Sequence, residues 1–221
     1  KPREKKTIAY HEAGHASVSW LLEHANPLVK VTIVPRGQAL GAAWYLPEER
    51  QITTKAQLLD QMVSLLGGRA AEELVFGEVS TGALNDLERV TKQAYAMVVY
   101  YGLDKEIGNL SFYDSSGQSE YGFQKPFSEK TAEKIDAQIR TMVEEAYEKA
   151  KSLLKDNREK LDALAQILVE REVIFREDVE AIYGPRPWDA ETEIKKDETE
   201  TKKEETEIKK EEIEIKKEND E

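Results

Sequence analysis

His11, Glu12 and His15 form the pattern His-Glu-x-x-His, which constrains the fold and chemistry of this chain more than any other feature. On an α-helix, residues four apart lie about 40° apart around the axis, so both imidazoles leave one face, one turn apart. Two imidazole nitrogens at this spacing can bind one zinc ion, and the glutamate between them can act as a general base. The pattern therefore predicts a helix that holds Zn²⁺ as a catalytic cofactor.

The sequence around the motif favours a helix. The stretch from Lys5 to Leu22 is rich in apolar residues, and no proline follows the motif until Pro27. Gly14 is a poor helix former, at a cost of about 1 kcal/mol relative to alanine, but it lets another backbone or a substrate come close to the metal. The alternative is a helix whose histidines only pack or cap. Against it stands the scarcity of histidine, with 3 in 221 residues.

The third metal ligand has to be found elsewhere in the chain, because a catalytic zinc site usually has three protein ligands and one open position. The chain has no cysteine, and His24, nine residues after His15, would lie on the opposite side of a continuous helix. The third ligand is therefore Asp or Glu. Spacing leaves three carboxylates about equal, namely Glu72, Glu73 and Asp86.

Each of these carboxylates also has an ordinary structural interpretation. Glu72 and Glu73 can be surface charges of a helix that pair with Arg69. Asn85 can cap a helix in which Glu88 completes a capping box and Asp86 favours the first-turn dipole. The spacing of the residues alone does not decide among these interpretations.

Periodicity predicts a mainly α (α+β) fold with a small β-sheet beside the His-Glu-x-x-His helix. Runs of β-branched and apolar residues predict strands, and apolar residues at helical spacing predict helices. The expected strands are 29–34 and 41–46, with a possible short one at 109–112 in a Gly- and Ser-rich stretch, 108–123, that we expect to be a mobile loop. The expected helices are 54–66, 70–76, 87–101, 128–155, 157–171 and 177–183.

Five motifs occur together in a fixed order along the chain. They are Tyr10-His-Glu-Ala-Gly-His15, Val34-Pro-Arg-Gly37, Leu46-Pro-Glu48, Leu66-Gly-Gly-Arg-Ala-Ala-Glu-Glu73 and Ser80-Thr-Gly-Ala-Leu-Asn-Asp86. Over about residues 3–188, the series closely resembles the peptidase domain of the FtsH family, the membrane-anchored AAA zinc metalloproteases of bacteria, mitochondria and chloroplasts.

The resemblance implies a set of site residues. It implies that His11, His15 and Asp86 are the zinc ligands and that Glu12 is the catalytic base, and it leaves Glu72 and Glu73 without a place on the metal. The edge of a small sheet can take an extended peptide as an added strand, although every small sheet has edges. The resemblance favours this substrate-binding role for Gly41, Ala42, Ala43 and Trp44.

The resemblance also implies a context for the chain. Family members degrade unfolded or membrane proteins, assemble as homo- or hetero-hexamers, and carry an ATPase module and membrane helices upstream. The protease domain then lies on the cytoplasmic face or in an organellar matrix. This chain opens without Met on Lys1, has no P-loop, and has no apolar run near the roughly 20 residues that span a bilayer. We therefore expect a soluble fragment that uses ATP and reaches the membrane only through upstream segments.

Residues 189–221 differ in composition from residues 1–188, which we expect to form one metallopeptidase domain. The last 32 residues repeat a Glu-Thr-Glu-Ile-Lys-Lys-Glu unit. They contain 14 acidic and 8 basic residues, and their net charge is half of the chain's −12. This composition predicts a disordered tail, with tail-mediated assembly as the alternative. The acidity also argues against nucleic acid as a partner.

Two other functions compete with that of a zinc endopeptidase. The first is a catalytically silent module that assembles the ring but does not cleave, against which the presence of Glu12 argues. The second is zinc-dependent hydrolysis of a substrate other than protein, because the motif itself specifies only attack of activated water on a carbonyl.

Overall fold

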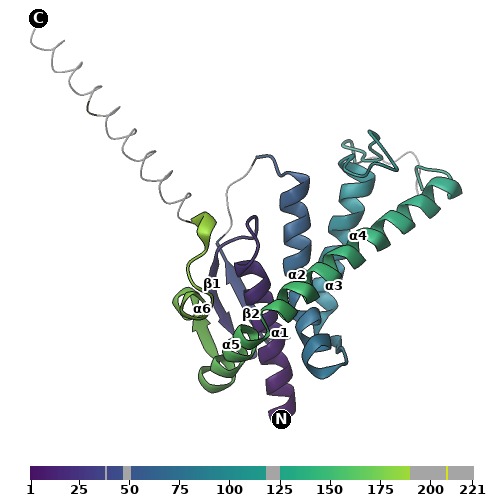
Figure 1. Ribbon diagram of the computed structural model, residues 1–221. Coiled ribbons are helices and arrows are strands. Elements are labelled where there is room, and N and C mark those ends of the chain that lie inside the picture. The colour runs from purple at the N-terminus through teal and green to yellow at the C-terminus, as the bar shows by residue number, and fades with distance from the viewer. Residues whose placement is uncertain (38, 47–50, 118–124, 190–207, 209–221) are drawn as a thin grey trace, which may run out of the picture. The chain divides into compact units, whose positions relative to one another are not determined.

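α1, the helix Pro2–Trp20, carries the His-Glu-x-x-His motif and lies at the centre of the domain. In the computed structural model, which describes residues 1–37, 39–46, 51–117, 125–189 and 208, every residue from Ala9 to Trp20 is buried. α1 packs mainly against α2, the helix Lys55–Phe76, and against α5, the helix Arg158–Arg171 (Figure 1). The His-Glu-x-x-His motif is therefore held by packing on several sides.

The chain divides into two units, Lys1–Tyr183 and Gly184–Glu221, and the named helices and strands belong to the first. The predicted tail, residues 189–221, is described only at Asp189 and Ile208, so its disorder stays a prediction. None of the described helices is long and apolar enough to cross a bilayer. The mainly α (α+β) fold predicted from periodicity is confirmed.

Two glycines that face each other let α1 and α2 cross closely. A Cβ atom added to Gly14 would lie 2.3 Å from the carbonyl oxygen of Gly67, and one added to Gly68 would lie 2.5 Å from Nε2 of His11. α2 runs through both of its glycines as one helix, from a capping box at Thr54 to Gly77. The predicted break at residues 67–69 is therefore wrong, because helix–helix packing here outweighs the low helix propensity of glycine.

The sheet has the strand order β2-β1-β3, with both pairs antiparallel. The strands are β1, Leu28–Thr32; β2, Ala42–Tyr45; and β3, Val173–Phe175. The first two correspond to predicted strands, whereas β3 was not predicted because three residues give too short a pattern to recognise. β2 is an edge strand, and a β-bulge interrupts its pairing with β1 between Leu28 and Lys30.

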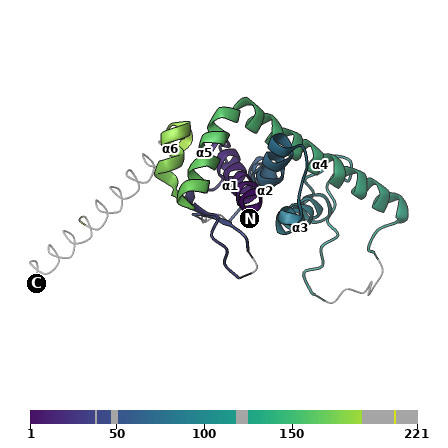
Figure 2. The ribbon, with the colours of Figure 1, turned by 90° about the horizontal axis from the view of Figure 1, so that it is seen from below.

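The second half of the unit is helical. α4, Glu129–Asp156, begins after the Ser128 cap and lies across α2 (Figure 2). α3, Leu84–Tyr95, continues a 3₁₀ turn, Thr81–Ala83, and is followed by one π-helical stretch, Ala96–Tyr100; α6, Arg176–Tyr183, closes the unit.

Two local predictions in this half are wrong. Asn85 lies inside α3 rather than at its cap, since Ser80 caps the preceding 3₁₀ turn and accepts a hydrogen bond from Gly82. Residues 109–112 form no strand. The predicted mobile loop lies partly outside the described residues, so its mobility stays a prediction.

Candidate metal centre

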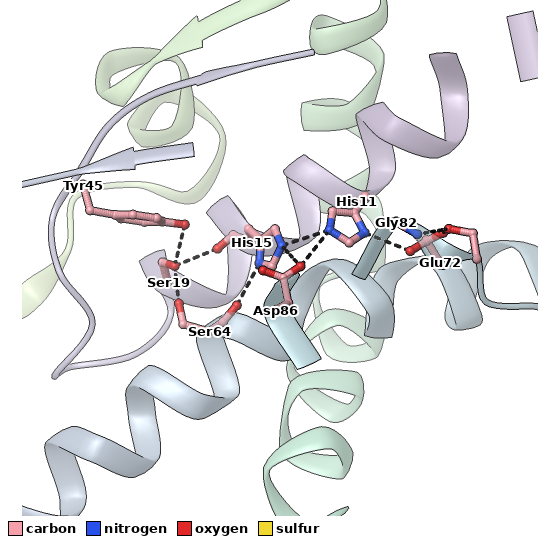
Figure 3. Close-up of polar contacts among 9 residues, drawn as sticks. His11, His15, Ser19, Tyr45, Ser64, Glu72, Gly82 and Asp86 are labelled. Carbon is pink, nitrogen blue, oxygen red and sulfur yellow. Dashed lines mark hydrogen bonds and ion pairs between the residues drawn. The ribbon is translucent and has the colours of Figure 1, made fainter. Parts of the chain in front are cut away.

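Three side chains from two helices converge on one point. His11 and His15 come from successive turns of α1, and Asp86 comes from the first turn of α3 (Figure 3). Nε2 of His11 lies 3.1 Å from Nε2 of His15, and Oδ2 of Asp86 lies 3.1 Å from each of them. Among the described residues, this trio is the group of His, Asp and Glu side chains suited to hold a metal ion.

Hydrogen bonds on the far side of each imidazole direct its other nitrogen to this point. Nδ1 of His15 lies 2.9 Å from the backbone carbonyl oxygen of Ser64, which can only accept, so Nδ1 carries the proton. Nδ1 of His11 lies 2.8 Å from Oε2 of Glu72, which fixes the same tautomer when Glu72 is ionised. In the neutral imidazoles, both Nε2 atoms then present lone pairs toward Asp86.

The donor set fits a zinc ion. Three lone-pair atoms that face one another at 3.1 Å repel unless a cation or a proton lies among them. A tetrahedral zinc site with ligand distances of about 2.0–2.1 Å places its ligands about 3.3 Å apart, close to the spacing seen here. Two imidazoles and one carboxylate, with no thiolate, are also a usual ligand set for catalytic zinc.

Glu72 and Glu73, which spacing could not separate from Asp86, have different positions. Glu72 is buried and accepts hydrogen bonds from His11 and from the hydroxyl of Ser80, behind the ring rather than at the convergence point. Glu73 accepts a hydrogen bond from Tyr147 and lies 3.6 Å from Lys151. Of the three candidate carboxylates, the structure brings only Asp86 to the two Nε2 atoms.

The charges around the trio shift its proton affinities in the absence of a metal. Burial disfavours the charged imidazolium of His11, but hydrogen bonds with Asp86 and Glu72 outweigh burial and raise its pKa from 6.5 to about 10. The same hydrogen bonds overcome the desolvation of both carboxyls, so the pKa values of Asp86 and Glu72 are lowered. The site is therefore electronegative and attracts a cation.

Glu12 lies beside the trio without taking part in it. Glu12 is 7% exposed, and burial raises its pKa, against the attraction of the two histidines. A Cβ atom added to Gly41 would lie 3.0 Å from Oε1 of Glu12, so the residue before β2 leaves room for this carboxylate. Within the described residues no hydrogen bond holds the Glu12 carboxylate. It is thus available to a water molecule or substrate.

The open edge of β2 begins next to Glu12. The amide of Ile33 donates to the carbonyl of Glu172, so the odd-numbered residues of β1 direct their backbone N–H and C=O groups toward β3. The even-numbered residues direct theirs toward β2, where Lys30 pairs with Trp44 and Thr32 pairs with Ala42. The backbone N–H and C=O of Ala43 are left at the open edge, between Gly41 and Tyr45.

Sequence reasoning missed a cluster of hydroxyls behind His15. Ser19 donates to the carbonyl oxygen of His15 at 2.7 Å, and its Oγ lies 3.2 Å from the hydroxyl of Tyr45 and in hydrogen-bond contact with Ser64 (Figure 3). Ser19 follows His15 by four residues and so lies one turn further along α1. That spacing is a signal for Ser19, but no local pattern connects it with Ser64 or Tyr45.

This site combines two histidines of one helix, a carboxylate that converges on them and a glutamate without a hydrogen bond among the described residues. Such an arrangement is that of a metal-dependent peptidase of the His-Glu-x-x-His class. The model of Peptidase family M41 matches residues 1–182. The chain belongs to this family.

Several curated relatives are similar over most of this chain. An ATP-dependent zinc metalloprotease FtsH of Parabacteroides distasonis is 65% identical over 185 residues, which is 84% of this chain and 27% of that protein. The FtsH of Karelsulcia muelleri is 54% identical over 82% of this chain and 29% of its own length. The mouse mitochondrial inner membrane m-AAA protease component AFG3L2 is 47% identical over 85% of this chain and 23% of its own length.

The chain thus spans under a third of the length of these relatives. The resemblance to the FtsH family that the five motifs carry is confirmed.

Proposed function

We propose that this chain is the zinc endopeptidase domain of an ATP-dependent, membrane-anchored AAA protease that degrades unfolded or membrane proteins. The observation that carries the proposal is the convergence of Nε2 of His11, Nε2 of His15 and Oδ2 of Asp86, each 3.1 Å from the other two. Its support from similarity is that the relatives are named ATP-dependent zinc metalloproteases.

His11, His15 and Asp86 hold the zinc ion in this proposal. When bound, the ion polarises the scissile carbonyl and lowers the pKa of water to about 7. Glu72 keeps the ring of His11 in the tautomer that presents Nε2, and the carbonyl of Ser64 does the same for His15. These two contacts orient the ligands before the metal arrives.

Glu12 is the general base. Its carboxylate accepts a proton from the attacking water and then donates it to the leaving amine. Burial suits both steps, since a carboxylate with a raised pKa binds the proton more readily than an exposed one does. Gly41 contributes space, because its missing side chain leaves the carboxylate unobstructed.

The substrate binds as an added strand along β2, over Gly41, Ala42, Ala43 and Trp44. The backbone N–H and C=O of Ala43 pair with the peptide, and this pairing is largely indifferent to the substrate's side chains. Such binding requires an extended segment, so an unfolded polypeptide is the natural substrate. The proximity of Gly41 to Glu12 brings the bound strand to the catalytic base.

The larger assembly is proposed from the relatives. Their names describe ATP-dependent proteases and a component of a mitochondrial inner membrane m-AAA protease. We therefore propose a homo- or hetero-hexamer in which segments outside this chain supply the ATPase and the membrane anchor. The protease domain then lies on the cytoplasmic face or in an organellar matrix.

Zinc analysis combined with cleavage of unfolded casein tests the proposal. We expect about one zinc per chain, cleavage that a chelator abolishes, and recovery when zinc is restored. Glu73→Gln serves as a matched control, because this carboxylate lies away from the convergence point. Zinc without cleavage would favour the catalytically silent assembly module, and a folded chain without zinc would contradict the metal site.

A further inference from the structure

The three hydroxyl groups behind His15 connect three elements, α1, α2 and β2, whose relative positions the proposed reaction needs to keep fixed. Tyr45 is the last residue of β2, Ser19 lies on α1 one turn after His15, and Ser64 lies on α2 (Figure 3). The peptide-binding edge and the metal-binding helix therefore meet at Ser19. In the mechanism proposed for Glu12 and the zinc trio, these hydroxyl groups take no part.

The protons of this cluster can be assigned. A hydroxyl has one proton and a carbonyl only accepts, so the proton of Ser19 goes to the carbonyl of His15, 2.7 Å away. The hydroxyl of Tyr45, 3.2 Å from Oγ of Ser19, then supplies the proton for its own contact. Burial also raises the pKa of Tyr45, which keeps this phenol a neutral donor at physiological pH.

The β-bulge in β1 lies directly opposite Tyr45. Leu28 pairs with Tyr45 and Lys30 pairs with Trp44, so Val29 is the extra residue. Bulges bend a strand and redirect the neighbouring side chains, and they are common beside active sites. Here the bulge coincides with the place where the Tyr45 hydroxyl reaches α1. The β-bulge in β1 and the hydrogen bond between Tyr45 and Ser19 are two separate observations at the same end of β2.

We propose that Tyr45 is a positioning residue that anchors the end of the peptide-binding strand to the metal-binding helix through Ser19. This inference rests on the proposed function, because it concerns where a peptide on β2 lies relative to the metal. The pairing with β1 holds β2 from one side only. The Tyr45–Ser19 contact fixes the distance of β2 from α1. It therefore also fixes the distance of the scissile bond from His15 and Glu12.

Loss of the Tyr45 hydroxyl then affects turnover more than binding. A peptide still pairs with the backbone of Ala43, so KM for Tyr45→Phe stays within about twofold. The scissile carbonyl is less well placed, and kcat falls about fivefold, the effect expected from one neutral hydrogen bond. Zinc content is unchanged, because the backbone carbonyl of Ser64 still holds His15.

The test compares Tyr45→Phe, Ser19→Ala and the double variant with a control, Tyr113→Phe. Tyr113 is 64% exposed and lies outside the cluster. Cleavage of a defined unfolded peptide gives kcat, KM and the distribution of cleaved bonds. Amide hydrogen exchange of Ala42–Tyr45, measured by mass spectrometry with and without zinc, gives the mobility of β2.

Both single variants should lower kcat, shift the cleaved bonds and speed exchange in β2, with no further effect in the double variant and none in Tyr113→Phe. Wild-type kcat and wild-type β2 exchange in Tyr45→Phe would overturn the inference, as would a raised KM at constant kcat. If the wild-type chain does not cleave, the failure belongs to the proposed function. In that case, faster amide exchange confined to β2 in Tyr45→Phe still supports the anchoring role of Tyr45, and exchange at the wild-type rate refutes it.

Discussion

Oε2 of Glu72 lies 2.8 Å from Nδ1 of His11, on the side of the ring away from Asp86. Glu72 also accepts a hydrogen bond from Ser80, which caps the turn that leads into the helix of Asp86. One buried carboxylate thus connects the histidine motif with the segment that supplies the third converging side chain. In the proposed mechanism, Glu72 orients a zinc ligand and Asp86 completes the site.

Substitution of Asp86 should weaken zinc binding more than substitution of Glu72. Asp86→Asn removes a charged ligand, whereas Glu72→Gln removes a contact behind a ligand and should cost about 10–100-fold in affinity. Glu73→Gln should bind zinc as the wild type does, because Glu73 contacts Tyr147 instead. Competition with a chromophoric chelator measures the three affinities. A larger loss in Glu72→Gln than in Asp86→Asn would move the third ligand to Glu72.

Glu12→Gln should separate metal binding from catalysis. The amide has nearly the same shape as the carboxylate but cannot accept the proton of the attacking water, so hydrolysis should fall about 10²–10⁴-fold. Zinc should remain near one per chain, because Glu12 is not among the converging atoms. Wild-type cleavage by this variant would show that another group is the base.

Gly41→Ala should impair hydrolysis while zinc stays bound. The added Cβ would lie 3.0 Å from both Oε1 of Glu12 and the carbonyl oxygen of Thr32, so either the base or the edge strand has to move. A displacement of this kind can cost about tenfold or more in rate. Peptide cleavage and zinc analysis on the same preparation check the result. Full activity would mean that the segment before β2 does not position Glu12.

Gly14→Ala should destabilise the domain despite the better helix propensity of alanine. Propensity alone predicts a gain of about 1 kcal/mol for this change in α1. The new Cβ would, however, lie 2.3 Å from the carbonyl oxygen of Gly67, and overpacking of this kind costs about 1–3 kcal/mol or more. Urea unfolding of both proteins measures the difference. Increased stability would show that the two helices separate easily.

Zinc affinity should rise with pH. In the metal-free chain the pKa of His11 is about 10, so zinc has to displace a proton at neutral pH. Affinity should increase about tenfold per pH unit below that pKa and level off above it. Calorimetric titration in buffers of different ionisation enthalpy counts the displaced proton. Affinity independent of pH between 7 and 9 would contradict the raised pKa.

The folding stability of the metal-free chain should fall as pH rises, whereas zinc affinity increases. The pKa of His11 is higher in the folded chain than its ordinary value of 6.5. Its protonation therefore stabilises the fold fully below pH 6.5, and this contribution is lost as pH rises toward about 10. Thermal unfolding of the metal-free chain between pH 6.5 and 9.5 measures the loss. Unchanged stability over this range would contradict it.

Local patterns were sufficient to predict the helix that carries the His-Glu-x-x-His motif, two of the three strands and the approximate limits of α4. They failed where tertiary contacts decide. Gly67 and Gly68 look like a helix stop, yet α2 passes through them because α1 packs against its backbone at that point. β3 is too short to give a pattern of its own and exists because β1 offers it a partner.

The site shows the same division between local and long-range information. The spacing of His11 and His15 needs only the helix period, so the pair could be predicted directly. Asp86 lies 71 residues from His15, and spacing could not separate it from Glu72, whose carboxylate bonds to the other nitrogen of His11. The contact between Tyr45 and Ser19 joins a strand to a helix, and no local sequence pattern encodes it.

Anomalous diffraction at the zinc absorption edge, from crystals of the chain grown with zinc, tests the metal site most directly. We predict one peak per chain, at about 2.0–2.2 Å from Nε2 of His11, Nε2 of His15 and an Oδ atom of Asp86. A peak bound by Glu72 in place of Asp86, or no peak among these three residues in a folded chain, would contradict the account.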